Sequence, residues 1–74
     1  MSNDTSILLF KTNIQTDGEQ QNIRQLLDKK PEITQWTIDT EDIDCVLRIV
    51  SKDIQPTQII TEITALGFEC AELE

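Results

Sequence analysis

Apolar and polar positions first form a clear pattern in residues 6–13, where an apolar run is bounded by polar residues. Such a run is typical of a buried strand. Because successive side chains of a strand point to opposite faces, only one parity can face the core. We expect the inward set to be Leu8, Phe10, Thr12 and Ile14, and the alternative parity carries Ile7 and Leu9.

Two later segments repeat apolar residues every three or four positions, which predicts amphipathic helices. The first helix begins after Thr16, within the polar stretch 15–22, and must end before Pro31, because proline cannot continue a helix. The second has Pro56 at its first position and runs to about residue 66, with Gly67 as a left-handed stop. Their predicted inner side chains are Ile23, Leu26 and Leu27, and then Ile59, Ile60, Ile63 and Leu66.

Three further strands complete the pattern. We predict them at residues 33–40, 45–50 and 68–73, with residues 51–55 as a connector. In the third strand, Cys45, Leu47 and Ile49 share the expected core face. With right-handed crossovers, this order predicts an α+β ferredoxin-like βαββαβ sandwich. Its antiparallel four-stranded sheet would have the order 4-1-3-2 with two helices on one face, and residues 1–74 would form one domain.

The charge of the chain constrains its partners. Fourteen acidic and six basic residues give a formal net charge of −8. This charge disfavours nucleic acid and anionic membranes and favours a protein partner with a basic surface. The chain contains neither a long apolar run nor a recognisable secretory signal, so we expect a cytoplasmic protein.

Few residues are suited to catalysis. Histidine is absent, and there is no nucleophile–base pair, glycine-rich phosphate loop or cofactor fingerprint. The two cysteines, Cys45 and Cys70, would lie on strands that flank the first strand, about 9–10 Å apart, which is too far for a disulfide. We therefore expect free thiols in the core, no cofactor and no enzymatic activity.

The start of the first helix carries a capping box. Thr16 is followed three residues later by Glu19, so the hydroxyl and the carboxylate can each accept a backbone N–H. Asp17 adds a negative charge at the positive end of the helix dipole. An anion site at this helix start is therefore disfavoured.

Two other features could form binding sites. Asp39, Glu41, Asp42 and Asp44 could bind Ca²⁺ or Mg²⁺ weakly, although an acidic hairpin exposed to solvent is the favoured interpretation. Trp36 lies on the second strand, which the predicted order places at a sheet edge. It either covers the core beside the first helix, which we favour, or anchors a partner or a second copy that adds to this edge.

Three segments resemble the heavy-metal-associated domain family, which includes copper chaperones and the N-terminal domains of metal-pumping ATPases. They are residues 14–19 with Ile23 and Leu27 behind them, residues 33–39, and residues 56–70. The family motif Met-x-Cys-x-x-Cys would fall on Ile14, Thr16 and Glu19, so the motif's methionine and both of its thiolates are replaced.

This resemblance implies a divergent member with a degenerate metal site. The favoured hypothesis is a noncatalytic protein-interaction module that uses its acidic surface or an exposed sheet edge. The alternative is a metal-handling protein that uses carboxylates or ligands from a partner.

Overall fold

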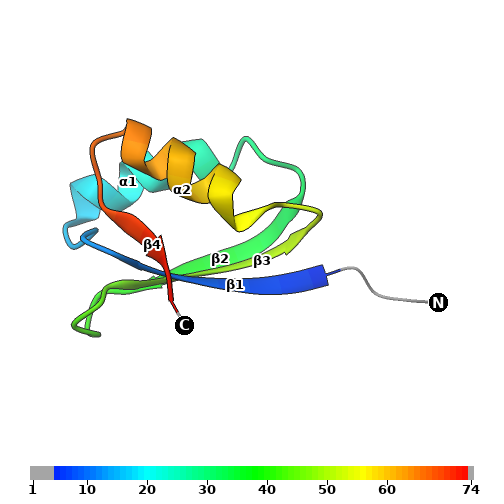
Figure 1. The fold of residues 1–74 in the computed structure, drawn as a ribbon. Helices are drawn as coiled ribbons and strands as arrows, with labels where there is room; N and C mark the ends of the chain where they lie inside the picture. Colours follow the sequence, from blue (N-terminus) through cyan, green and yellow to red (C-terminus); the bar gives the residue numbers. More distant parts are fainter. Residues whose placement is uncertain (1–4, 74) are drawn as a thin grey trace.

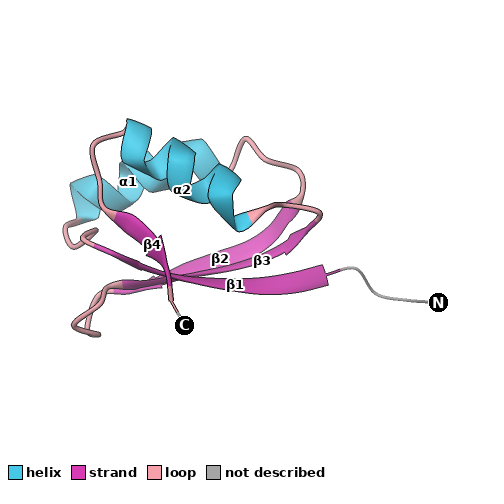
Figure 2. Ribbon diagram, in the orientation of Figure 1, coloured by secondary structure: helices cyan, strands magenta, loops and turns pink. Residues whose placement is uncertain are grey.

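The computed structural model describes residues 5–73 of the chain, except for the side chain of Thr5. A four-stranded sheet forms one layer, and both helices lie together on one side of it (Figure 1). Loops join the elements at both ends of the sheet (Figure 2). The elements are β1 (Thr5–Thr12), α1 (Asp17–Leu27), β2 (Ile33–Asp39), β3 (Val46–Lys52), α2 (Pro56–Ala65) and β4 (Cys70–Glu72).

The sheet has the strand order β2-β3-β1-β4, and every neighbouring pair is antiparallel. The predicted order and the antiparallel pairing are therefore confirmed. The central strand β1 pairs with β3 from Thr5 to Phe10 and with β4 at its other end. The ends of the predicted domain, residues 1–4 and 74, lie outside the described residues.

The core lies between the sheet and the helices. The predicted parity of β1 is confirmed, since Phe10 and Ile14 are fully buried while Ile7 and Leu9 are exposed on the opposite face. Burying one large apolar side chain contributes about 1.5–3 kcal/mol. The buried cluster consists of Phe10, Ile14, Ile23, Leu27, Leu47, Ile49, Ile54, Ile59 and Ile63.

Strand β3 differs from its predicted bounds at both ends. Cys45 precedes the strand, because its φ of 44° is left-handed rather than extended. Ser51 and Lys52 lie in the segment predicted as a connector, but they belong to β3 and pair with Ser6 and Thr5 of β1. Pairing with the neighbouring strand overrides the weak strand preference of these polar residues. As a result, Ser51 is fully buried on the core face.

The end of α2 agrees with the prediction to within one residue, but the predicted burial of Leu66 is wrong. The helix stops at Ala65, and Leu66 is 47% exposed instead of facing the core. The N–H groups of Leu66 and Gly67 donate to the Ile63 and Thr64 carbonyls at 3.1 and 3.0 Å, so the last turn tightens and Leu66 does not continue the buried face of α2. Gly67 has a φ of 99°, so the predicted left-handed stop is confirmed. Strand β4 is shorter than predicted, and Phe68 packs against the core before it begins.

Between residues 5 and 73, neither helix has the length and apolar character needed to span a membrane.

Candidate functional site

The loop between β1 and α1 is closed by its own side chains. The Glu19 N–H donates to Thr16 Oγ1 at 3.2 Å, and Glu19 Oε1 accepts the N–H groups of Thr16 at 3.1 Å and Gln15 at 2.9 Å. The predicted capping box is confirmed. The backbone N–H groups of Gln15 and Thr16 lower the pKa of the Glu19 carboxyl. Ile14 is fully buried, so at this position the loop contributes to the core.

This carboxylate makes stability depend on pH. The folded-state pKa of Glu19 lies below its ordinary value of 4.5. The contribution of this carboxylate to the free energy of unfolding is therefore complete above pH 4.5 and is lost as the pH falls through the folded-state pKa. We expect Glu19→Gln to lower the melting temperature at neutral pH, and the difference from the native chain to disappear in strong acid. Thermal unfolding monitored by circular dichroism measures this. Glu41→Gln removes an exposed carboxylate outside the capping box and should not reproduce the pH dependence.

The acidic turn between β2 and β3 uses two of its carboxylates to shape the backbone. Asp39 Oδ1 accepts the N–H of Glu41 at 3.1 Å, and Asp42 Oδ1 accepts the N–H of Asp44 at 2.9 Å. The Asp44 carbonyl in turn accepts the N–H of Thr12, which ties the turn to β1. Within the described chain, no three Asp, Glu, Cys or His side chains are grouped so that they could hold a metal ion.

The two cysteines are free thiols. Cys45 is 2% exposed, and its carbonyl accepts the Thr12 hydroxyl at 2.7 Å. Burial raises the pKa of the Cys70 thiol to about 11. The Cys70 thiol is therefore protonated at neutral pH and is a poor nucleophile.

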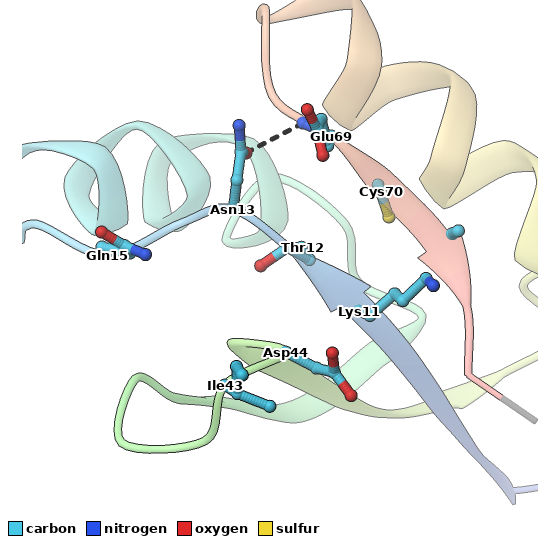
Figure 3. A pocket seen from close by; sticks show the side chains of 9 residues that line it. Lys11, Thr12, Asn13, Gln15, Ile43, Asp44, Glu69 and Cys70 are labelled. Atoms are coloured by element: carbon cyan, nitrogen blue, oxygen red, sulfur yellow. Dashed lines mark hydrogen bonds between the residues drawn. The ribbon is translucent and has the colours of Figure 1, made fainter.

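A hollow of about 460 Å³ lies where the end of β1, the β2–β3 turn and β4 meet (Figure 3). Asn13 is part of its wall, but its Oδ1 already accepts the N–H of Glu69 at 2.9 Å. The hollow was not predicted, because it depends on the pairing of β4 with β1. Its lining residues are Lys11, Thr12, Asn13, Gln15, Ile43, Asp44, Glu69, Cys70 and Ala71.

Trp36 packs against the core beside α1, which is the favoured prediction. Its indole N–H donates to Asp28 Oδ1 at 3.4 Å, and the Arg24 guanidinium carbon lies 5.9 Å from the ring centroid. These contacts hold the ring against the last turns of α1. Trp36 is therefore partly buried and is not a freely exposed anchor.

Strand β2 forms one edge of the sheet. It pairs with β3 along one side, and no strand of residues 5–73 lies along the other side. A register shift between Ile33 and Gln35 marks the start of the strand. The edge therefore presents backbone donors and acceptors that have no ladder partner.

Comparison of the chain with protein-family models, with curated proteins and with solved structures gives no match.

Proposed function

We propose that the chain is a noncatalytic protein-binding module whose β2 edge accepts an extended basic segment of a partner by strand addition. The observation that carries this proposal is the unpaired edge, which is seven residues long. Lysine, proline and β-bulges are among the features that protect natural edge strands; β2 contains no lysine or proline, and its one irregularity is the register shift between Ile33 and Gln35. A strand of this length can form a ladder with an added segment.

The charges around β2 favour a basic segment. Glu32 precedes the strand, Asp39 ends it, and Glu41 follows in the turn; all three are exposed. A nearby base, Lys30, is already paired, since its Nζ lies 2.8 Å from Glu62 Oε2. A second copy of the chain would bring the same carboxylates to the same edge. Self-association through β2 should therefore be weaker than binding of a basic segment.

The strand order supports a ferredoxin-like fold, and we propose a divergent relationship with heavy-metal-associated domains. In this proposed alignment, the capping box of Thr16 and Glu19 would stand where the family has its two thiolates. A module that has exchanged thiolates for a helix cap retains the framework without the soft ligands that Cu(I) requires. Binding to a protein is then the function that the exposed surfaces support best.

A synthetic peptide can test strand addition without a known partner. The probe is an acetylated peptide of about nine residues in which lysine alternates with valine, long enough to cover the edge. Titrated into the ¹⁵N-labelled chain, it should shift the amide signals of β2 first. Two control peptides separate the contribution of charge from the contribution of backbone hydrogen bonds. One replaces each lysine with glutamate, and the other keeps every side chain but has alternate backbone nitrogens methylated.

Both controls should bind more weakly than the probe by about tenfold, because one reverses the charge and the other removes backbone donors. In the protein, Thr37→Lys places a positive charge on the edge, like those of the probe, and should weaken binding of the probe. Thr57→Lys on α2 should leave binding of the probe unchanged. Equal binding of the methylated peptide, or shifts centred away from β2, would refute strand addition.

A further inference from the structure

The face of the sheet opposite the helices is not covered by any element of residues 5–73 (Figure 1). The strand registers define its members, because residues paired across the sheet share a face. This surface is called the open face here. It consists of Ile7, Leu9 and Lys11 of β1, Val46, Arg48, Val50 and Lys52 of β3, Gln35, Thr37 and Asp39 of β2, and Ala71 of β4.

Apolar side chains are contiguous in the middle of the open face. Ile7 is 56% exposed and pairs directly with Val50, and Leu9 is 39% exposed two residues farther along β1. These side chains form the apolar strip of the open face. The N–H of Leu73 donates to the Leu9 carbonyl at 2.9 Å, which brings a further apolar residue beside this strip. Isolated exposed aliphatic residues are common on protein surfaces, but here they adjoin across paired strands.

The open face is basic in an acidic protein. It carries Lys11, Arg48 and Lys52, which are three of the six basic residues of the chain, against the single acid Asp39. All four side chains are exposed. The formal charge of the whole chain is −8, so the remaining surface carries the acidic excess. The open face therefore has the electrostatic character that attracts an acidic partner.

Three other occupants fit this face less well. Single-stranded nucleic acid would need aromatic stacking platforms, but Phe10, Trp36 and Phe68 all pack on the core side. A second copy docking face to face would oppose two basic surfaces. An extended strand cannot add to the face of a sheet, because the backbone groups of its central strands are already paired within the ladder.

We infer that the open face binds an acidic amphipathic helix of a partner protein. The apolar side chains of this helix would cover Ile7 and Leu9. The carboxylates of the helix would lie beside Lys11, Arg48 and Lys52. Four strands spaced at about 4.8 Å give a surface roughly 19 Å wide, enough to seat three or four helical turns. This inference concerns a different surface from the β2 edge and does not depend on strand addition.

The probe is a labelled helical peptide of about 18 residues, with leucine along one side and glutamate flanking it. Fluorescence anisotropy measures its affinity for the full chain, and amide shifts locate the site. We expect the shifts to be centred on Ile7, Leu9, Arg48 and Val50. A peptide of the same composition in scrambled order, and one with lysine in place of glutamate, should each bind at least about tenfold more weakly.

Matched variants test the charge and the apolar strip separately. Arg48→Glu should weaken binding by about tenfold, whereas Lys29→Glu, at an exposed position after α1, changes the net charge equally and should not. The double variant Ile7→Ser and Leu9→Ser should cause a similar loss, with its fold checked by circular dichroism. Equal loss in Lys29→Glu, or shifts confined to other surfaces, would overturn the inference.

One substitution separates this inference from the proposed strand addition. Thr37 lies on β2 and also on the open face, where it pairs with Arg48. Thr37→Lys should weaken the basic extended peptide but leave the affinity of the acidic helix unchanged or raise it. Loss of helix binding in this variant would contradict docking on the open face. Unchanged binding of the extended peptide would instead contradict strand addition at β2 and would leave docking on the open face unaffected.

Discussion

Phe10→Ala is expected to lower the free energy of unfolding by about 3–5 kcal/mol, the usual cost of removing a buried phenylalanine. Phe10 is fully buried on the central strand, where it pairs with Leu47 of β3 and Glu72 of β4. A domain of this length has a total stability of roughly 4–11 kcal/mol. The substitution therefore removes a large part of that stability, and the melting temperature should fall by roughly 12–40 °C.

The matched control lies on the same strand with opposite parity. Ile7 is 56% exposed, and Ile7→Ala should change the free energy of unfolding by less than about 1 kcal/mol. Urea unfolding followed by the fluorescence of Trp36 measures both variants, since this residue packs against the core. Comparable losses in the two variants would show that the parity of β1 is wrong.

The parity of β1 was predictable because alternation along a strand leaves only two choices, and the helices cover one face. The capping box was also predictable, because Thr16 and Glu19 interact locally within one helical turn. Such features depend on residues close in sequence. Their physical causes can therefore be read from spacing alone.

The errors arise where pairing between distant residues, or the exact end of a helix, decides the outcome. Ser51 has a polar side chain typical of a connector, yet its backbone pairs with Ser6, which lies far away in sequence. Leu66 continues the apolar spacing of α2, but the helix ends one residue earlier, beside the turn at Gly67. Neither the pairing nor the exact helix end is encoded by periodicity.

The open face depends partly on local alternation along β1 and partly on pairing between strands that are distant in sequence. The alternative parity of β1, with Ile7 and Leu9, was visible in the sequence as a second apolar set. The sequence alone does not show that Ile7 and Leu9 lie beside Val50 and Arg48 of β3, because this alignment depends on the register between β1 and β3. The acidic composition of the chain pointed to basic partners. The structure adds a basic surface that local charge counting does not reveal.

Replacing both Thr16 and Glu19 with cysteine is expected to create a metal site. The two side chains meet at the start of α1, where each now accepts the other's backbone N–H at 3.1–3.2 Å. A helix start lowers the pKa of a thiol, and two adjacent thiolates suit Cu(I) and Zn²⁺. The reduced double variant should therefore bind one Cu(I) more tightly than micromolar, whereas the native chain should not.

The substitution removes the capping box, so the metal-free variant should lose about 0.5–2 kcal/mol and regain stability when metal binds. A Cu(I) titration against a chromophoric chelator, with parallel thermal unfolding, measures both effects. The single variant Thr16→Cys tests whether both thiols are needed, and the pair Thr61→Cys and Thr64→Cys places the same spacing away from a helix start. Failure of the double variant to bind would contradict the proposed alignment with the heavy-metal-associated motif, because that alignment places both ligands here. Tight binding by the native chain would instead favour metal handling, since the existing carboxylates or Cys45 and Cys70 would then have to supply the ligands.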